Sequence, residues 1–202
     1  MVSIYDLKPE FQSRLRPLVD GLARRGVTAN QITVAAFALS LAAGLILLVS
    51  PGATVPLLLV PVALFIRMAL NAVDGMLARE HGQKSDLGAF LNELGDLLSD
   101  AALYLPFAVI PGVSAEIVVI VVVLAGASEL AGTAALLIGA SRRYDGPMGK
   151  SDRAFAFGAI AFLLAIGARA GLWLDLVFVV ILVLLLVTIA NRVRRAIAEA
   201  HP

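Results

Sequence analysis

Six stretches of mainly apolar residues, each about as long as a membrane-spanning helix, alternate with short polar connections along this chain. A helix needs about 20 mainly apolar residues to cross the hydrocarbon core of a bilayer. The predicted spans lie near residues 31–50, 55–73, 87–110, 117–140, 154–170 and 172–189. Helix-breaking Pro-Gly pairs, Pro51-Gly52 and Pro111-Gly112, end the first and third spans. The pattern predicts an all-α integral membrane protein with six transmembrane helices, folded as one domain over residues 1–202.

Ahead of the first span, apolar residues recur every three or four positions with charged residues between them. They are Phe11, Leu15, Leu18, Val19 and Leu22. This spacing predicts an amphipathic helix over about residues 8–25 that lies in the membrane interface. The alternative is a solvated helix whose apolar face packs on the rest of the protein.

The composition agrees with a membrane protein. Hydrophobic residues make up 60% of the chain, whereas a soluble domain is typically about 45–50% apolar. A formal net charge of +1 argues against nucleic-acid binding by bulk charge. The chain has no Cys, which excludes disulfides and thiolate chemistry.

Basic residues gather before the first span, in alternate connections and after the last span. They are Lys8, Arg14, Arg16, Arg24, Arg25, Arg79, Lys84, Arg142, Arg143, Lys150, Arg153, Arg192, Arg194 and Arg195. Basic loops stay on the cytoplasmic side. The first residues also lack the apolar core of a cleavable signal peptide. We therefore expect a multi-pass protein of the cytoplasmic (inner) membrane, with both termini and the 79–86 and 141–153 loops in the cytoplasm.

Carboxylates and side-chain amides follow helical spacing in and beside the second and third spans. The candidate metal ligands are Asn71, Asp74, Asn92, Asp96 and Asp100. An ionised group inside a membrane costs roughly 2.5–3.5 kcal/mol on insertion scales, so such groups usually face a cavity, a partner or a metal. Oxygen ligands suit Mg²⁺ or Mn²⁺, with Ca²⁺ as a further candidate. The alternative is that these groups only hydrogen-bond helices together.

Small residues and a cation follow the first of these acids. Gly75 and Ala78 allow another backbone or a flat ligand to approach closely. Arg79 adds a fixed positive charge that suits phosphate. We expect this surface to face the cytoplasm together with the acids.

The spacing of Asp74-Gly75, Ala78-Arg79, Gly88, Asn92 and Asp96 resembles the signature of the CDP-alcohol phosphatidyltransferase family, D-x2-D-G-x2-A-R-x8-G-x3-D-x3-D. The segment 29–33, ANQIT, also looks like the P-N-x-x-T motif at the start of that family's first span. Two positions depart from the signature, because its first and third Asp are Asn71 and Asn92 here.

The resemblance implies roles for these residues. The first three signature Asp residues hold two divalent ions that carry the pyrophosphate of a CDP-linked lipid, and the fourth is the general base. Asp96 then inherits the base role and Asp74 remains a metal ligand. An Asn can still bind a metal through its carbonyl oxygen but does not offset its charge. We expect one or two Mg²⁺ or Mn²⁺ ions, with nucleotide contacts from Thr33, Asp74, Gly75, Ala78, Arg79 and Gly88.

The 141–153 connection is a second polar cluster. The family often has a Gly-Lys loop here that lines the acceptor pocket, and residues 149–153, GKSDR, look similar. Lys150 and Arg153 are the preferred ligand-binding residues, for an acceptor that carries a phosphate. The alternative is a topology signal that also contacts anionic headgroups. Glu129 in the fourth span has two interpretations. Its side chain reaches the active cavity, or it pairs with a cation such as Arg67.

The resemblance implies a metal-dependent transfer of a phosphatidyl group from a CDP-alcohol, such as CDP-diacylglycerol, to an acceptor alcohol, with release of CMP. Two alternatives stay open: a CDP-lipid hydrolase, and a non-catalytic lipid- or nucleotide-binding relative that lost turnover with Asn71 and Asn92. Family members are commonly homodimers, so a second copy and the surrounding membrane lipids are the expected partners, and nucleic acid is not.

Overall fold

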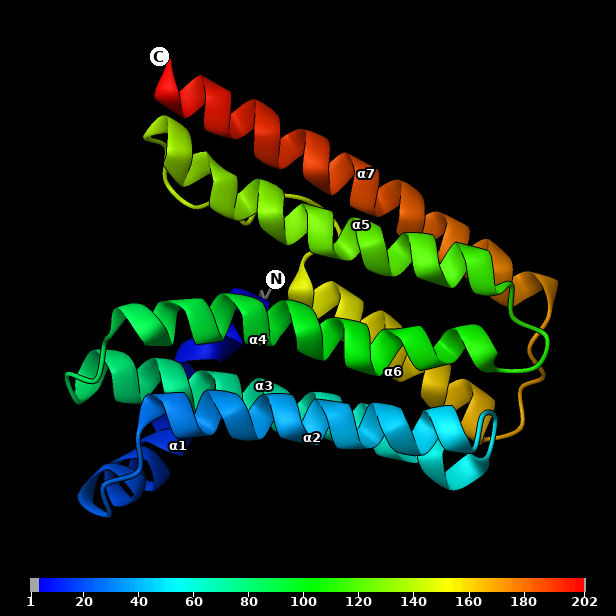
Figure 1. Ribbon diagram of the computed structural model, residues 1–202, viewed down its shortest axis with the longest axis horizontal. Helices are drawn as coiled ribbons and strands as arrows, with labels where there is room; N and C mark the ends of the chain where they lie inside the picture. Colours follow the sequence, from blue (N-terminus) through cyan, green and yellow to red (C-terminus); the bar gives the residue numbers. More distant parts are fainter. Residues whose placement is uncertain (1–3, 202) are drawn as a thin grey trace. The chain divides into compact units, whose positions relative to one another are not determined.

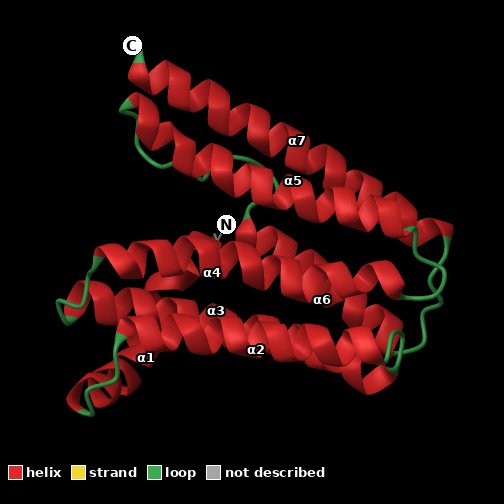
Figure 2. Cartoon of the chain, in the orientation of Figure 1, coloured by secondary structure: helices red, strands yellow, loops and turns green. Residues whose placement is uncertain are grey.

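The computed structural model describes residues 4–201, with side chains described from residue 10 to residue 201. Those residues form helices joined by short loops, and no strand occurs among them (Figure 2). The long helices are α1 (Ile4–Arg24), α2 (Ala29–Val49), α3 (Thr54–Glu80), α4 (Asp86–Tyr104), α5 (Ala115–Ala134), α6 (Lys150–Ala165) and α7 (Leu172–Ala200) (Figure 1). Two short 3-10 helices, η1 (Leu105–Val109) and η2 (Ala135–Ile138), extend α4 and α5. The prediction of an all-α protein is confirmed.

Four helical segments among the described residues are long and apolar enough to cross a membrane. They are α2, α3, α5 continued through η2 to Ile138, and α7. The α4 helix contains 19 residues and carries several acids, and α6 contains 16 residues. A 16-residue helix is only about 24 Å long, shorter than the roughly 30 Å hydrocarbon core. The chain is thus a multi-pass helical membrane protein, and the full count of six spans stays a prediction.

Several predicted boundaries differ from the observed ones. The third predicted span runs to residue 110, but α4 ends at Tyr104 and the chain tightens into η1. Pro106 explains this change, because proline disfavours α geometry at the residue before it. The last helix continues past the predicted end at residue 189 to Ala200. Residues 190–200 are less apolar than the span before them, but they are rich in Ala and Arg, which favour helix.

The chain divides into two compact units. The first contains Met1–Leu41 and Ala63–Ser99, and the second contains Ala42–Val62 and Asp100–Pro202. Because these bounds fall within helices, α2, α3 and α4 each contribute residues to both units.

The first unit is built around contacts between α1, α2 and α3. Val19 is fully buried against Val73, Met76 and Leu77 of α3, and Leu15 and Leu22 pack beside it. The apolar stripe of α1 therefore packs largely on the protein, as in the alternative interpretation of this helix. Leu18 of the same stripe remains 53% exposed. The interfacial position of α1 stays a prediction.

In the second unit, α5 and α7 lie side by side (Figure 1). An aromatic cluster fills its core: the ring of Phe157 stacks on Tyr104 with centroids 4.0 Å apart and also contacts Phe107 and Phe178. All four side chains are fully buried. This cluster joins the end of α4, η1, α6 and α7.

Candidate active site

The signature residues lie on the last turns of α3 and the first turns of α4, both in the first unit. Glu80 ends α3, and Gly82 in the connecting loop has a φ of +66°, a backbone conformation that favours glycine. The hydroxyl of Ser85 accepts a hydrogen bond from the backbone N–H of Gly88 at 3.0 Å. Ser85 therefore caps the N-terminus of α4, and this cap determines where the polar stripe of α4 begins.

A hydrogen bond joins the two polar stripes. The Asn71 side-chain amide donates to Asp96 Oδ1 at 3.2 Å, which connects α3 to α4. Asp96 is partly exposed, at 23% of its side chain. The structure thus brings together the candidate base and the residue at the first signature position.

Arg67 also belongs to this site, although its place there was not predicted from the sequence. Its side chain is 3% exposed, and its Nη2 donates to the backbone carbonyl of Asp96 at 3.0 Å and lies 3.4 Å from Asp96 Oδ1. The available signal was its position one helical turn before Asn71. Spacing alone did not identify which acid on a neighbouring helix it would meet.

Thr33 connects α2 to the same site. Its hydroxyl donates to Asp74 Oδ2 at 2.9 Å, with the backbone carbonyl of Ala29 as a second acceptor at 3.1 Å. Asp74 is 5% exposed, so this contact satisfies part of a nearly buried carboxylate. The segment that resembles the family's motif at the start of its first span thus contacts the second signature position directly.

The glycines of the signature have specific neighbours. A Cβ added at Gly88 would lie 2.8 Å from Asn30 Oδ1 and 3.0 Å from Ser85 Oγ. One added at Gly75 would lie 3.0 Å from Nη1 of Arg79. The Arg79 guanidinium therefore lies over Gly75, where the sequence argument expected an open surface for a ligand.

The donor chemistry of this region suits a hard divalent cation. Asp74 and Asp96 provide carboxylate oxygens, and Asn71 and Asn92 can provide amide oxygens. The two negative charges of Asp74 and Asp96 balance the charge of one divalent ion. Asn92 lies on α4 one turn before Asp96 and is half-buried. Within the described part of the chain, no group of three or more Asp, Glu, His or Cys side chains gathers as a metal cluster.

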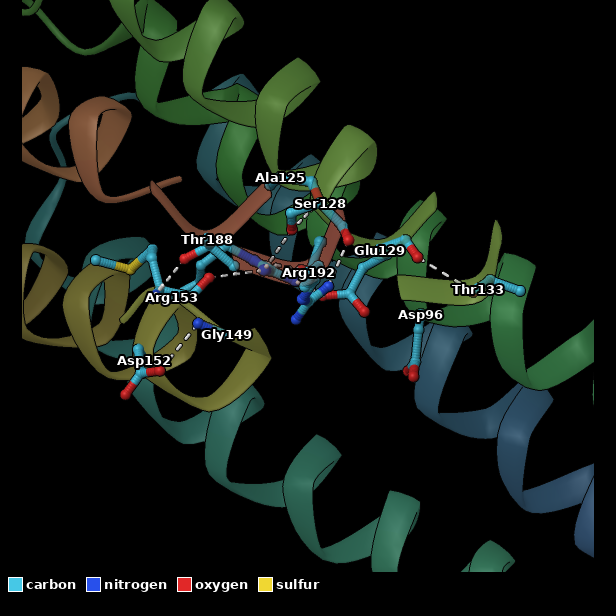
Figure 3. A network of polar contacts seen from close by, with 12 residues as sticks. Asp96, Ala125, Ser128, Glu129, Thr133, Gly149, Asp152, Arg153, Thr188 and Arg192 are labelled. Carbon is cyan, nitrogen blue, oxygen red and sulfur yellow. Dashed lines mark hydrogen bonds and ion pairs between the residues drawn. The ribbon is translucent and has the colours of Figure 1, made fainter. Parts of the chain in front are cut away.

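Asp100, the last residue of the predicted metal set, lies in the second unit and contacts an arginine there. Arg153 is fully buried on α6, and its Nε and Nη2 donate to Asp100 Oδ2 at 3.2 and 2.9 Å. The same Nη2 donates to Glu129 Oε1 at 2.9 Å. Its Nη1 reaches the Ser128 hydroxyl and the Met148 carbonyl, both at 3.3 Å (Figure 3). Arg153, predicted as a ligand-binding residue, is thus enclosed by protein groups.

Three arginines surround Glu129. Besides Arg153, Arg192 lies 3.5 Å from Glu129 Oε1 and Arg142 lies 3.8 Å from Oε2. Arg192 is also buried and donates to the backbone carbonyl of Ser128 (Figure 3). Glu129 therefore pairs with cations, as one interpretation expected, although the partners are these arginines, while Arg67 bonds to Asp96 in the first unit.

The loop before α6 is also held by ion pairs and hydrogen bonds. Arg143 contacts Asp145 at 2.8 Å and Glu199 at 2.5 Å, and Arg195 contacts Asp145 at 2.5 Å. Burial acts to raise the pKa of Asp145, but hydrogen bonds from Arg143 and Arg195 outweigh it and hold that pKa below its ordinary value. The loop is thus an ordered element of the second unit. Lys150, the other predicted ligand-binding residue, begins α6 and is half-buried.

Known proteins resemble this chain over most of its length. A family model described as CDP-alcohol phosphatidyltransferase matches residues 26–193. The chain is 47% identical to the inner membrane protein YnbA of Escherichia coli K12 over 193 residues, which cover 96% of each protein. It is 32% identical to the archaetidylinositol phosphate synthase of Pyrococcus horikoshii over 97 residues, 48% of this chain and 49% of that one.

Solved structures with the same fold are also known. A crystal structure of Mycobacterium tuberculosis phosphatidylinositol phosphate synthase in complex with manganese and citrate matches with a TM-score of 0.76 and 20% identity, over 92% of this chain and 91% of that chain. The same synthase with CDP-DAG bound matches with a TM-score of 0.70 and 20% identity, over 91% and 92% of the two chains. At this identity the likeness concerns the fold.

Proposed function

Because this chain belongs to the CDP-alcohol phosphatidyltransferase family, we propose that it transfers a phosphatidyl group from a CDP-alcohol to the hydroxyl of an acceptor alcohol and releases CMP. The observation that carries the proposal is the Asn71–Asp96 hydrogen bond at 3.2 Å. It supports a site in which the general base lies beside the residues of the first half of the signature. The CDP-DAG bound to the mycobacterial synthase supports a CDP-linked lipid, such as CDP-diacylglycerol, as the donor.

In this proposal the two halves of the signature have different tasks. Asp96 takes the proton from the acceptor hydroxyl. The acceptor oxygen then forms a bond to the lipid-proximal phosphorus, and the bond from that phosphorus to the bridging oxygen breaks, so that CMP leaves with the bonding electrons. The Arg79 cation over Gly75 contacts the phosphates of the nucleotide. Ala78 is small and leaves room for the nucleotide, whereas Asn30 and Ser85 already lie over Gly88.

Asn71, Asp74 and Asn92 would hold a divalent cation, with Asp96 beside it. Mg²⁺ or Mn²⁺ bound there supplies Lewis-acid stabilisation of the pyrophosphate. The manganese in the mycobacterial structure supports this choice of ion. Thr33 orients the Asp74 carboxylate through its 2.9 Å hydrogen bond. We assign Asp100 to Arg153 as a counter-ion, because Arg153 donates twice to one of its oxygens.

The acceptor is a small alcohol. The names of two relatives contain inositol phosphate, which makes a phosphorylated alcohol the first candidate to test. The ion pairs around Glu129 and Asp145 instead favour an acceptor without a phosphate. A phosphate that bound Arg142, Arg143 or Arg153 would have to displace the carboxylates paired with these arginines. Both classes of alcohol therefore belong in the test.

We further propose a six-span protein of the inner membrane that forms a single domain, with both termini and the site at the cytoplasmic face. The inner-membrane relative YnbA supports the compartment, and the distribution of basic residues supports the orientation. A homodimer is the expected assembly, and its test is the mass of the detergent-solubilised protein.

The experiment is CMP release by protein purified into lipid nanodiscs, supplied with CDP-diacylglycerol, Mg²⁺ or Mn²⁺, and a panel of alcohols. The panel contains inositol, serine and glycerol together with inositol phosphate and glycerol phosphate. Acceptor-dependent release that is lost with a chelator and falls at least about 100-fold in Asp96→Asn supports the transferase. Release without any alcohol indicates a hydrolase. Retained binding of CDP-diacylglycerol with no release under any condition indicates the non-catalytic relative.

A further inference from the structure

Arg67 lies where the family signature has lost negative charge. The first and third positions of the signature are Asp, but this chain has Asn71 and Asn92 there. The site therefore contains two fewer carboxylates than the signature provides. One turn before Asn71, a buried arginine donates to Asp96, which is also the acceptor for Asn71. A cation and one neutral amide thus approach the same carboxylate.

We propose that Arg67 supplies a fixed positive charge in place of a second divalent ion, so that this site works with one Mg²⁺ or Mn²⁺ per chain. The proposal rests on the transferase function proposed above. The signature carboxylates that remain are Asp74 and Asp96, and Arg67 is present whatever the number of ions. Before the donor binds, two divalent ions would leave these groups with a net charge of +3, whereas one ion leaves +1.

The geometry makes Arg67 a positioning residue for Asp96 as well. Its Nη2 bonds to the backbone carbonyl of Asp96 at 3.0 Å, and its side chain is 3% exposed, so surrounding protein holds the guanidinium in place. The Arg67 and Asn71 side chains both approach Oδ1 of Asp96, at 3.4 and 3.2 Å. A guanidinium retains its charge at all accessible pH values, so this cation is present before any metal or substrate binds.

A charge so close to a cation site has a measurable consequence. Arg67 lies 3.4 Å from Asp96 Oδ1, so its guanidinium would repel a divalent ion held beside that carboxylate. Removing Arg67 should therefore tighten the binding of Mn²⁺ while it slows the transfer reaction. A residue with a merely structural role would weaken both.

The test counts Mn²⁺ ions by titrating the purified protein in nanodiscs and measuring free Mn²⁺ by electron paramagnetic resonance. We expect one bound ion per chain in the wild type. In Arg67→Gln we expect about tenfold tighter Mn²⁺ binding, with at least about tenfold slower CMP release. Arg67→Lys keeps the charge and should return the Mn²⁺ affinity to that of the wild type. Arg14→Gln removes an exposed cation paired with Glu10 on α1 and is the matched control, with no expected change.

A second variant keeps the test informative if Arg67→Gln does not fold. Asn71→Asp combined with Asn92→Asp restores the two carboxylates of the signature and should raise the count to two Mn²⁺ ions per chain. Two ions in the wild type, or an unchanged Mn²⁺ affinity in folded Arg67→Gln, would overturn the proposal. Failure of the proposed transferase is distinguished from these outcomes, since it appears as no CMP release by the wild type with any alcohol, whatever the ion count.

Discussion

Arg153 and Asp100 form a buried ion pair in which two guanidinium nitrogens, Nε and Nη2, donate to one carboxylate oxygen at 3.2 and 2.9 Å. Asp100 follows the signature on α4, and Arg153 lies in the first turn of α6, so the pair joins two segments that are far apart in the sequence. Glu129 on α5 provides a second carboxylate for the same arginine. The pair therefore connects three helices of the second unit through one cation.

Removing this cation should destabilise the second unit strongly. In Arg153→Met, Asp100 and Glu129 lose a buried partner, and breaking such a pair from one side costs about 3–5 kcal/mol. Thermal unfolding in detergent, followed by intrinsic fluorescence or circular dichroism, measures the effect. Neutralising both acids in the same chain, with Asp100→Asn and Glu129→Gln, should recover part of the loss. Arg194→Met removes an exposed arginine of α7 and should leave the melting temperature nearly unchanged; an equal loss in this control would contradict the role of burial.

The Thr33–Asp74 contact predicts a graded effect on metal and donor binding. Thr33→Val keeps the shape of the side chain but removes the donor to Asp74 Oδ2, so the carboxylate is less well oriented. We expect about three- to tenfold weaker Mn²⁺ binding, and a larger loss in Asp74→Ala, which removes the ligand itself. Thr33→Ser keeps the hydroxyl and should retain the wild-type affinity. Equal Mn²⁺ affinities in all three variants would remove both residues from the metal site.

At Gly44, α2 lies too close to α4 for a side chain to fit. A Cβ added at Gly44 would lie 1.9 Å from the backbone carbonyl oxygen of Ala102, within the second unit. Because a backbone atom cannot rotate away, Gly44→Ala should cost at least about 1–3 kcal/mol, in the range of overpacked cores. Gly21→Ala on α1 is the control, since its nearest neighbour is the end of the Arg24 side chain at 3.9 Å. It should be neutral or slightly stabilising, because alanine favours helix. A similar decrease in melting temperature for both variants would contradict the close contact.

The ion pairs of Asp145 predict a stability contribution that depends on pH. Its pKa is lower in the folded protein than its ordinary value, as a result of Arg143 and Arg195, although burial opposes the shift. The contribution is therefore complete above the ordinary pKa of about 4 and is lost as the pH falls through the lower folded value. Asp145→Asn should reduce the melting temperature at neutral pH. The difference from the wild type should shrink below about pH 4; a difference that stayed constant to pH 3 would exclude ionised Asp145 as its source.

Local features were predictable from the sequence because they depend on neighbours along the chain. The apolar stretches gave the positions of α2, α3, α5 and α7, since a helix satisfies its backbone within one segment. The spacing of Asp74, Arg79, Gly88 and Asp96 identified the family. The start of α4 also follows from a local cap at Ser85. The exact helix ends were less predictable, because polar helix formers extended α7 to Ala200.

The tertiary structure alone decided the partners of the buried charges. Arg67 could have paired with any acid on a neighbouring helix, and it bonds to Asp96. Arg153 and Asp100 appeared to be ligand-binding residues from their types and positions, yet they bond to each other. The apolar face of α1 packs on Val73, Met76 and Leu77. Hydropathy and spacing say which residues share a helix face, but an ion pair or a packing contact depends on which helix lies opposite that face, and this is determined only when the whole chain folds.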